Sequence, residues 1–479
     1  MSSCPPSLAG PEDGRPFRPS VRRRGGSADP AGRGNPEKGG SLGSGKKNPP
    51  ETLDSRPAPE GFLSGPFSPG RFPQILYGMG SGAGIAAGPE TAMSASGSVR
   101  LQILVFSLVA AAISNMYLTQ PVLPVLEEEF GISPALASLT VSAVIAGLAL
   151  ANLPFGWLAD RYPVRVLLLL GAGAVAGAGL LCALTRSFPL LVAARFVQGL
   201  FIPALTTCLA AYLSGLLPPA RLNVVMGSYV AATVAGGLGG RLLGGWLHPP
   251  LHWRAAFVTA AGLVVTAAVA AGLWLPAGPP APRRAEEGEG FLGLLRRGDL
   301  RPAFLAAASA MSVFAAVFNY LPFYLAGPPF FASTQAITLM YLTYLLGIVV
   351  GPASGRLSDR VGNGPTMAGG ALLMAGALVL TMIPARPAIL GALALLCTGF
   401  FALHAAAAGA LNRKLLASRG RANSLYVLLY YLGGTGGITL SGFCFTWARW
   451  PGVVGLGLLT LVIPLAAGLK ESRPPAPKD

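Results

Sequence analysis

Long apolar segments dominate the sequence from residue 101 onward. Each runs for about 20 residues, the length that an α-helix needs to cross the hydrocarbon core of a bilayer. The strands of a membrane β-barrel are about ten residues long with alternating polarity, and these segments have neither property. The pattern predicts an all-α membrane protein with twelve transmembrane helices, at residues 101–126, 133–157, 164–184, 188–213, 221–246, 254–275, 302–326, 332–355, 365–384, 388–411, 421–446 and 450–469.

The longest polar interruption separates the sixth apolar segment from the seventh. We therefore predict two six-helix bundles, residues 101–275 and 302–470. A cytoplasmic linker at 276–301 joins them, and a short tail at 471–479 follows.

The first part of the chain has a different composition. Residues 1–95 are rich in Gly, Pro, Ser and Arg and poor in aliphatic side chains. Such a segment cannot bury enough apolar surface to offset its chain entropy, so we predict a disordered tail. Met93 stands just before the first apolar segment and is an alternative start of translation. We expect residues 1–92 to be either a dispensable tail or, if translation starts at Met93, not made at all.

Composition excludes a soluble protein and a nucleic-acid partner. Only 11% of the residues are charged and 52% are hydrophobic, whereas soluble domains carry about 25% charged residues. The net charge is +16. From residue 101 onward, the positive charges stand in short gaps between apolar segments. A nucleic-acid-binding protein would instead gather them on one face of a soluble fold.

The positive charges predict the orientation in the membrane. If both termini are cytoplasmic, the cytoplasmic side carries 17 Lys and Arg and the outer side carries four. Cytoplasmic loops carry such an excess, so we expect a multi-pass protein of the cell's inner or plasma membrane with both ends inside. The outer four are Arg186, Arg254, Arg386 and Arg449, and the inner set is Arg161, Arg165, Arg221, Arg283, Arg284, Arg296, Arg297, Arg301, Arg356, Arg360, Arg413, Lys414, Arg419, Arg421, Lys470, Arg473 and Lys478.

The two halves of the membrane part repeat each other. The sequence GWLADR at 156–161 follows the second segment, and GRLSDR at 355–360 follows the eighth, 199 residues later. Arg221-x-Asn223 and Arg421-x-Asn423 open the fifth and eleventh segments at an offset of 200. A parallel repeat of six spans predicts two bundles related by an axis along the membrane normal, with a substrate bound between them near mid-membrane.

The loop after the second segment resembles the signature of the major facilitator superfamily, G-x-L-A-D-R-x-G-R-R/K. Pro163 replaces the second Gly of that signature. The resemblance covers residues 101–470 and implies a secondary transporter that works by alternating access. The matching residues are Gly156, Leu158, Ala159, Asp160, Arg161 and Arg165, and Gly355, Asp359 and Arg360 repeat part of the set.

We predict that these two loops gate the transporter. A carboxylate at the membrane surface, such as Asp160, can accept charge-assisted hydrogen bonds from a neighbouring helix end or from an Arg of the other bundle. Bonds made in one state only would bias the conformation closed on the inside. The alternative is a static topological anchor.

The fourth segment carries a charged residue. Arg195, Gln198 and Gly199 match the R-x-x-Q-G pattern that the family has in this helix. A charge within a span is costly and by default marks a functional site. Arg195 and Gln198 are three residues apart and so share a helix face. The alternative is that Arg195 extends toward the nearby membrane surface.

The fifth segment resembles the antiporter branch of the family. That branch has G-x8-G-x3-G-P-x2-G-G in this helix, and Arg241 replaces its Pro. The matching glycines are Gly227, Gly236, Gly240, Gly244 and Gly245. Glycines on one face permit close packing of helices. Arg241 becomes a second buried cation, and Pro121-Val122-Leu123-Pro124 adds a short similarity to the same exporter branch.

Ionisable residues within the spans are few. No Asp or Glu stands in the middle of a span, and His404 is the one group there that titrates near neutrality. With Arg195 and Arg241 inside and no acid, neutral or anionic cargo is favoured. The remaining candidates for substrate contact, for which hydrogen bonding between helices is the alternative, are Asn115, Tyr117, Thr119, Gln120, Asn319, Tyr320, Tyr324, Tyr426 and Tyr430.

Several chemistries are absent from the sequence. No G-x-x-x-x-G-K-[ST] loop exists for ATP. His248, His252 and His404 do not form a metal set, and no nucleophile–base arrangement stands out, so we expect no enzyme activity, metal or cofactor. The sequence favours proton-coupled efflux of a small organic solute by a monomer in the lipid bilayer. The alternatives are an importer, symporter or uniporter of a neutral or anionic metabolite, and a non-transporting sensor.

Overall fold

The computed structural model describes residues 95–276, 288–415 and 418–472. Within these ranges the chain is helical and contains no strand. The predicted N-terminal tail up to residue 94, with Met93, lies outside the described residues. So do residues 277–287 of the predicted linker and residues 473–479 of the C-terminal tail.

Helices occupy all twelve predicted spans. In the first half they are α1 Ala95–Ser114, η1 Gln120–Val122, α2 Leu123–Phe130, α3 Pro134–Ala137, α4 Leu139–Ala159, α5 Val164–Leu184, α6 Phe188–Leu205, α7 Thr207–Leu216, α8 Pro219–Leu247 and α9 Trp253–Trp274. In the second half they are α10 Phe291–Arg296, α11 Arg301–Ala326, α12 Thr334–Met340, η2 Tyr341–Leu345, α13 Leu346–Val361, α14 Asn363–Leu380, α15 Arg386–Arg413 and α16 Arg419–Glu471.

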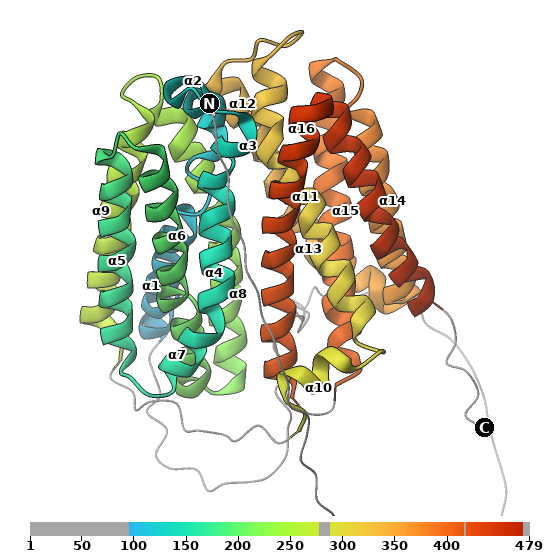
Figure 1. Ribbon diagram of the computed structural model, residues 1–479. Helices are drawn as coiled ribbons and strands as arrows, with labels where there is room; N and C mark the ends of the chain where they lie inside the picture. The colour runs from blue at the N-terminus through green and yellow to red at the C-terminus, as the bar shows by residue number, and fades with distance from the viewer. Residues whose placement is uncertain (1–94, 277–287, 416–417, 473–479) are drawn as a thin grey trace, which may run out of the picture. The chain divides into compact units, whose positions relative to one another are not determined.

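The helices form two bundles of six spans each, as predicted (Figure 1). In the described part, nine helical stretches are long and apolar enough to cross a membrane. Helices α1 and α8 fill two further predicted spans, and α16 covers the last two. Non-helical backbone at Ala448 (φ −130°) and Arg449 (φ 53°) divides α16 into two parts. This kink stands where the sequence predicts the loop between the eleventh and twelfth spans.

The first span is interrupted, which corrects the prediction of one helix over 101–126. Helix α1 ends at Ser114, and η1 and α2 follow only from Gln120 onward. Pro121 and Pro124 lack the backbone N–H that a continuous helix would need, and their rings clash with the preceding turn. The interruption frees backbone carbonyls inside the membrane part, and these need other partners.

Glycines bring α8 against the interrupted span. A β-carbon at Gly240 would lie 2.1 Å from the carbonyl oxygen of Ser114, and one at Gly244 would lie 1.9 Å from that of Leu118. In the second bundle, a β-carbon at Gly437 of α16 would lie 2.3 Å from the carbonyl oxygen of Ser312 in α11. In both bundles, therefore, glycines of the fifth span allow its backbone to pack closely against the first span.

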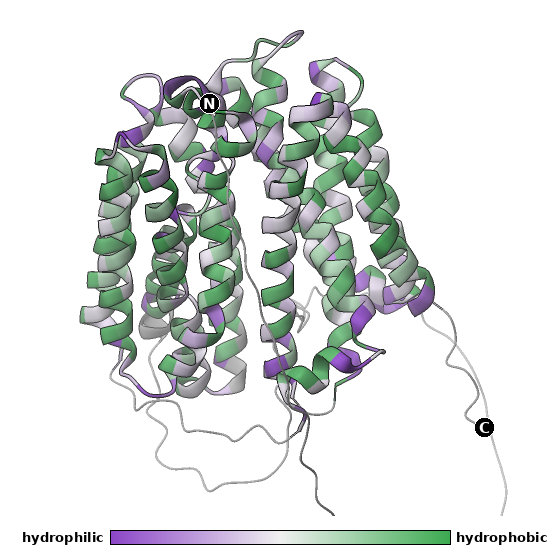
Figure 2. Cartoon of the chain, in the orientation of Figure 1, coloured by the Kyte–Doolittle hydropathy of each residue, from purple (hydrophilic) through white to green (hydrophobic). Residues whose placement is uncertain are grey.

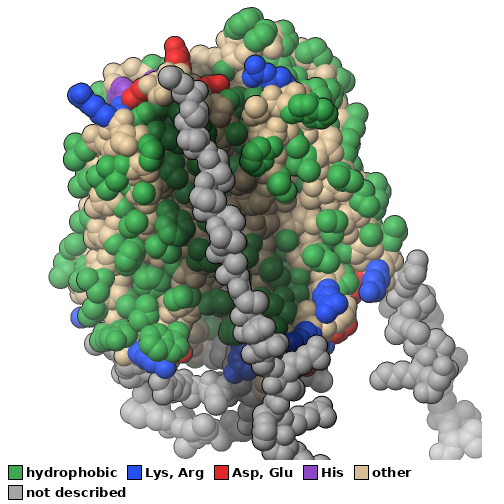
Figure 3. All heavy atoms as spheres, viewed as in Figure 1, with side chains coloured by type: hydrophobic (Ala, Val, Ile, Leu, Met, Phe, Trp, Pro, Cys, Tyr) green, Lys and Arg blue, Asp and Glu red, His purple; other side chains and the backbone are tan. Residues whose placement is uncertain are grey.

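Polar residues mark the two ends of the bundles. In Figure 1 the upper end carries α2, α3 and α12, and the lower end carries α10. Polar residues gather at these ends, and apolar residues predominate along the helices between them (Figure 2). Large apolar side chains such as Leu170 and Val349 are 64% and 71% exposed. An extensive apolar surface of this kind is suited to contact with lipid (Figure 3).

Candidate functional site

The two bundles meet through residues in the upper halves of their helices. Asn319 of α11 donates from Nδ2 to Oγ of Ser138, between α3 and α4, over 2.7 Å. Gly245 of α8 has no room for a side chain, because a β-carbon there would lie 1.8 Å from Oγ1 of Thr338 in α12. The predicted residue Asn319 therefore joins the bundles. Its Oδ1 is buried and has no hydrogen-bond partner among the described residues.

Arg195 of α6 is fully buried, and four of its five N–H groups donate hydrogen bonds. Its Nε donates to the carbonyl oxygen of Thr140 over 2.8 Å. Its Nη1 donates to the carbonyl oxygen of Asn115 over 2.6 Å and to Oε1 of Gln198 over 2.7 Å. Its Nη2 donates to the carbonyl oxygen of Met116 over 2.7 Å. All these acceptors are neutral.

The contacts of Arg195 stabilise the backbone at the interruption of the first span. Asn115 and Met116 stand directly after α1, where the helix no longer supplies donors for their carbonyls. A guanidinium carries five N–H groups in a fixed plane, so it can satisfy several carbonyls at once. Arg195 from α6 thereby holds the interrupted backbone in place.

Three predicted substrate-binding residues, Asn115, Arg195 and Gln198, bind one another, and a fourth, Thr119, binds Thr140. Gln198 donates from Nε2 to Oδ1 of Asn115 over 3.4 Å, and Oγ1 of Thr140 donates to Oγ1 of Thr119 over 3.1 Å. Asn115, Thr119, Arg195 and Gln198 are each 0% exposed. Their role in substrate binding stays a prediction, and in this conformation they have a structural function.

Arg241 of α8 has a different environment. It is 2% exposed, and it donates from Nε to Oε1 of Gln120 over 2.7 Å and from Nη1 to the carbonyl oxygen of Gly237 over 2.8 Å. Side-chain hydrogen bonds also join Arg241 to the hydroxyls of Tyr117 and Tyr344. Nε2 of Gln120, which is itself 0% exposed, is buried without a partner.

Aromatic rings from both bundles surround the guanidinium of Arg241. The ring of Tyr117, in the first bundle, lies 4.0 Å from the guanidinium carbon. From the second bundle, Tyr344 lies at 4.9 Å, Tyr341 at 5.3 Å and Phe318 at 5.8 Å. We call Tyr117, Phe318, Tyr341 and Tyr344 the aromatic box. Each ring lies within cation–π distance, so the box holds a cation of one bundle against the other.

His404 forms a separate cluster inside the second bundle. Its Nδ1 lies 3.0 Å from the hydroxyl of Tyr426, and its ring stacks on Phe400 with 5.9 Å between centroids. The ring of Tyr430 lies 5.1 Å from that of His404. The structure thus brings together the predicted residues His404, Tyr426 and Tyr430. The hydrogen bond between α16 and α15 is also the contact expected of an interhelical histidine.

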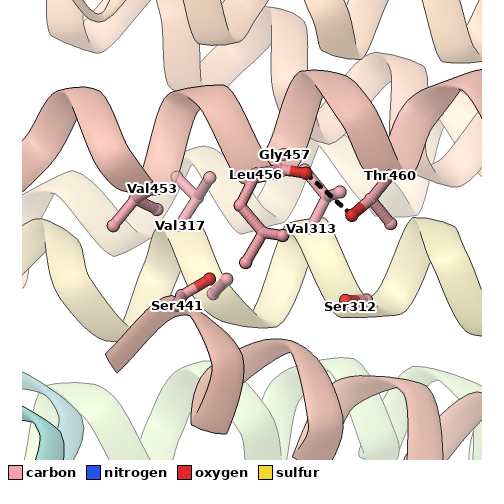
Figure 4. Close-up of a pocket in the computed structure, with 9 residues that line it drawn as sticks. Ser312, Val313, Val317, Ser441, Val453, Leu456, Gly457 and Thr460 are labelled. Atoms are coloured by element: carbon pink, nitrogen blue, oxygen red, sulfur yellow. Dashed lines mark hydrogen bonds between the residues drawn. The ribbon is translucent and has the colours of Figure 1, made fainter. Parts of the chain in front are cut away.

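A small apolar cavity lies elsewhere in the second bundle, between α11 and the two parts of α16 (Figure 4). The hydroxyl of Thr460 on its wall donates to the carbonyl oxygen of Leu456 over 2.8 Å. No charged side chain lines the cavity, so it is a packing gap and not a candidate for solute recognition. Its lining is Ser312, Val313, Ala316, Val317, Ser441, Val453, Leu456, Gly457 and Thr460.

The two predicted gating loops differ in their ion pairs at the lower end. Asp359, near the end of α13, accepts a hydrogen bond from Nη2 of Arg413 over 2.8 Å. Asp160 caps the C-terminus of α4 and is exposed, and no described side chain forms an ion pair with it. A carboxylate at a helix C-terminus interacts unfavourably with the helix dipole. Asp160 therefore lacks the compensation that Asp359 has.

The other residues of the first loop have partners of their own. The guanidinium of Arg161 lies 3.6 Å from the ring centre of Trp157. Arg165 donates to the carbonyl oxygen of Leu275 at the end of α9. At Gly156 a β-carbon would meet no atom within 4 Å, so this glycine is not required by packing. In the second loop, Gly355 is buried and Arg360 is exposed without an ion pair to a described residue.

The sequence profile described as Major Facilitator Superfamily matches residues 104–404 and 330–479. The chain belongs to the major facilitator superfamily. It is 30% identical over 382 residues to the inner membrane transport protein YnfM of Escherichia coli (strain K12), covering 78% of this chain and 91% of that protein. It is 30% identical over 305 residues to the chloramphenicol resistance protein of Streptomyces lividans, covering 59% and 74%.

A solved structure agrees in fold. A bacterial homologue of the human lysosomal transporter Spinster, in its inward-facing and unoccupied conformation, superposes with a TM-score of 0.66. The alignment covers 80% of this chain and all of that chain at 16% identity. The two bundles of this superfamily member are thus those of a membrane transporter, and its homologues are not enzymes.

Sequence reasoning did not single out most of the aromatic box of this transporter. Tyr341 and Tyr344 are three residues apart in η2, and a 3₁₀-helix places such residues above one another on one face. The apolar sequence of residues 332–355 does not indicate a 3₁₀-helix at Tyr341–Leu345. Ser138, which receives Asn319, was also missed. The sequence does show Tyr117 in the first span and Tyr341 and Tyr344 in the eighth. Only the contacts between the bundles show that all three surround the guanidinium of Arg241.

Proposed function

We propose that this superfamily member exports a small organic solute in exchange for protons, by alternating access between its two bundles. The observation that carries the proposal is the placement of the contacts between bundles. Asn319 on Ser138, Thr338 on Gly245 and the box around Arg241 all lie in the upper halves of the helices. On the face drawn in Figure 3 the surface is recessed between the two bundles.

The gating loops support the same mechanism. Asp160 is exposed and unpaired with any described side chain at the lower end, and it stands unfavourably at a helix C-terminus. We infer that it gains an Arg partner of the other bundle when the lower ends approach each other. Charge-assisted bonds made in one state only shift the equilibrium toward that state.

Two features support export over import. The glycines of α8 match the antiporter branch, and those at 236, 240 and 244 lie against the first span. The relative from Streptomyces lividans is a resistance protein for a small organic compound. With the excess of Lys and Arg at the lower end, we place this end and both termini in the cytoplasm, in a monomer of the inner or plasma membrane.

One observation favours a second candidate, uniport or symport of an anion. Every described Asp and Glu of the membrane part lies at a helix end, in the short helix α2 or in the linker. Proton-driven transporters commonly keep a carboxylate inside the bundle. His404 with Tyr426 is the titratable pair that remains inside the second bundle.

Proton movement in inverted membrane vesicles with an acid interior tests the proposal. Chloramphenicol, lipophilic cations, sugars and small organic acids are added one at a time, and the interior pH is followed with a trapped dye. We expect at least one compound to dissipate the gradient, and Asp160→Asn to abolish the effect. A labelled solute that moves without any proton movement supports the second candidate, and no movement of any solute contradicts both.

A further inference from the structure

Arg241 is a buried cation without a buried anion. Its acceptors are all neutral: Oε1 of Gln120, the carbonyl oxygen of Gly237, and the hydroxyls of Tyr117 and Tyr344. Among the described residues no carboxylate contacts it, although it is 2% exposed. Removing a charge from water is costly unless a partner compensates for it. Cation–π contacts supply part of that compensation, and a carboxylate would supply more.

A second unsatisfied group lies beside it. Nε2 of Gln120 is buried with no hydrogen-bond partner in the described part of the chain. It belongs to the same carboxamide whose oxygen receives the hydrogen bond from Nε of Arg241. A buried donor left unpaired is destabilising. Arg241 and Gln120 thus offer two neighbouring N–H donors, one of them cationic, to a group that the chain itself does not provide.

Arg195, the other buried arginine, is not suited to bind an added anion. All three nitrogens of Arg195 donate to oxygens, and its acceptors are fixed by the interrupted first span. Displacing them would leave backbone carbonyls unsatisfied. Most acceptors of Arg241 are instead side chains, those of Gln120, Tyr117 and Tyr344, which can turn toward other partners. Arg241 can therefore take an added anion without leaving several backbone carbonyls unsatisfied.

We propose that Arg241 and Gln120 bind the carboxylate of the transported solute, and that this solute is an amphipathic organic monoanion with an apolar or aromatic body. The proposal rests on the proposed transport function and names its substrate class. Two donors match the two oxygens of one carboxylate, and one guanidinium balances one negative charge. The aromatic box supplies flat apolar surfaces for the rest of the molecule.

This arrangement also links binding to movement. Three of the four rings belong to the second bundle, while Arg241 and Gln120 belong to the first. A carboxylate at Arg241 competes with the cation–π contacts that hold the bundles together at this level. The bound solute therefore weakens a contact between the bundles, which is what a transported ligand must do to promote the change of state.

The test measures binding to the full-length protein in lipid nanodiscs by calorimetry. The probes are the ω-phenylalkanoates from phenylacetate to 6-phenylhexanoate, each paired with its primary amide of the same shape. At least one acid should bind about tenfold or more tightly than its amide, the size of one charge-assisted interaction. Equal affinities throughout the series overturn the proposal.

Three variants test whether the preference for the acid over its amide depends on Arg241. In Arg241→Gln the affinity for the acid should fall to within about threefold of that for the amide, since one factor of ten is lost with the charge. Gln120→Glu places a fixed carboxylate beside Arg241, so it should weaken acid binding more than amide binding and raise the melting temperature. Arg386→Gln, which changes an arginine at the start of α15 and outside the box, should keep the full preference.

The failure of this inference is distinguishable from that of the transport function. If Arg241→Gln does not fold, Gln120→Glu alone decides, because it keeps the arginine and adds its counter-charge. Acid binding unchanged in Gln120→Glu overturns the proposal. In proteoliposomes, flux of a neutral solute without any preference for acids leaves the transporter intact and refutes only the carboxylate site, whereas no flux of any solute refutes the transporter.

Discussion

At the scale of single residues, the two buried arginines differ in what they bind. Arg195 satisfies three backbone carbonyls, whereas most acceptors of Arg241 are side chains and aromatic rings surround it. The sequence shows both as charges within spans. Pro121 and Pro124 mark the interruption of the first helix in the sequence. The sequence could not show that Arg195 of α6 binds the carbonyls freed there, because that contact depends on how two distant segments pack.

Replacing Arg195 should therefore unfold the protein more readily than replacing Arg241. Arg195→Gln leaves the carbonyls of Asn115, Met116 and Thr140 without donors. We expect its free energy of unfolding to fall by about 3–5 kcal/mol, as when one partner of a buried charged network is removed. Arg241→Gln should cost clearly less. Thermal unfolding in detergent measures both, and a larger loss for Arg241→Gln would contradict the structural role of Arg195.

A second residue-scale prediction concerns pH at the upper end. Burial raises the pKa of Glu129, but hydrogen bonds from Trp253 and Arg254 outweigh it and hold the pKa below its ordinary value of 4.5. A carboxyl with a lowered pKa stabilises the folded state above the unfolded value, and this contribution disappears as the pH falls through the folded value.

The melting temperature of Glu129→Gln should thus lie below that of the native chain at pH 7. The difference should shrink as the pH is lowered below about 4.5, where the native carboxyl becomes protonated. Thermal unfolding at a series of pH values measures it. A difference that stays constant down to about pH 3 would show that the charge of Glu129 is not what stabilises this end.

At the scale of helices, glycine positions set the distance between the first and fifth spans of each bundle. Gly240 has no room for a β-carbon, whereas at Gly239, its neighbour in sequence, a β-carbon would meet no atom within 4 Å. The pair offers a matched experiment on one helix, because both changes add the same methyl group.

Gly240→Ala should lower the free energy of unfolding by about 1–3 kcal/mol, as overpacking does, and should reduce transport. Gly239→Ala should be neutral or stabilising by up to about 1 kcal/mol, since Ala favours helix more than Gly. Thermal unfolding and solute flux measure both effects. Equal behaviour of the two variants would show that close contact between α8 and the first span is unimportant.

Helix positions were largely predictable, and the register of the contacts between helices was not. Apolar length alone places the spans, because a bilayer requires about 20 apolar residues. The sequence repeat, at an offset of 200, aligns Gly237 with Gly437. In the structure, however, the close contact of Gly437 with Ser312 corresponds to that of Gly240 with Ser114. Alignment of two glycine-rich helices can slip by about one turn, since glycines recur at that spacing on one face.

At the scale of the whole molecule, orientation in the membrane is open to a direct test. Ser187, between α5 and α6, lies at the upper end, and Ser472, after α16, lies at the lower end. Each is replaced by Cys in a chain freed of its native cysteines. A membrane-impermeant thiol reagent should label Ser187→Cys in intact cells and Ser472→Cys only after permeabilisation. The reverse pattern would place the termini outside.

The sequence shows which residues have the chemistry for gating or substrate binding. It does not show which partners these residues have in the fold. Asp160 and Asp359 occupy equivalent positions in the repeat, yet only Asp359 has an ion pair, with Arg413, in the described part of the chain. A repeat in sequence predicts equal chemistry. It does not predict that two bundles in one conformation present different neighbours at the same loop.

The central claim is that transport requires the upper ends of the two bundles to separate, and a reversible cross-link tests it most directly. Cysteines replace Ser138 and Asn319, which join the bundles through their side chains. In the control, cysteines replace Asn152 and Thr207, which contact each other within the first bundle. Both pairs are oxidised in inverted vesicles, and solute flux is measured before and after reduction.

Our account predicts that the cross-link between residues 138 and 319 stops flux and that reduction restores it. The cross-link between residues 152 and 207 should leave flux unchanged, because it joins two helices that move as one body. Undiminished flux with the bundles fully cross-linked at their upper ends would contradict alternating access by separation of these ends.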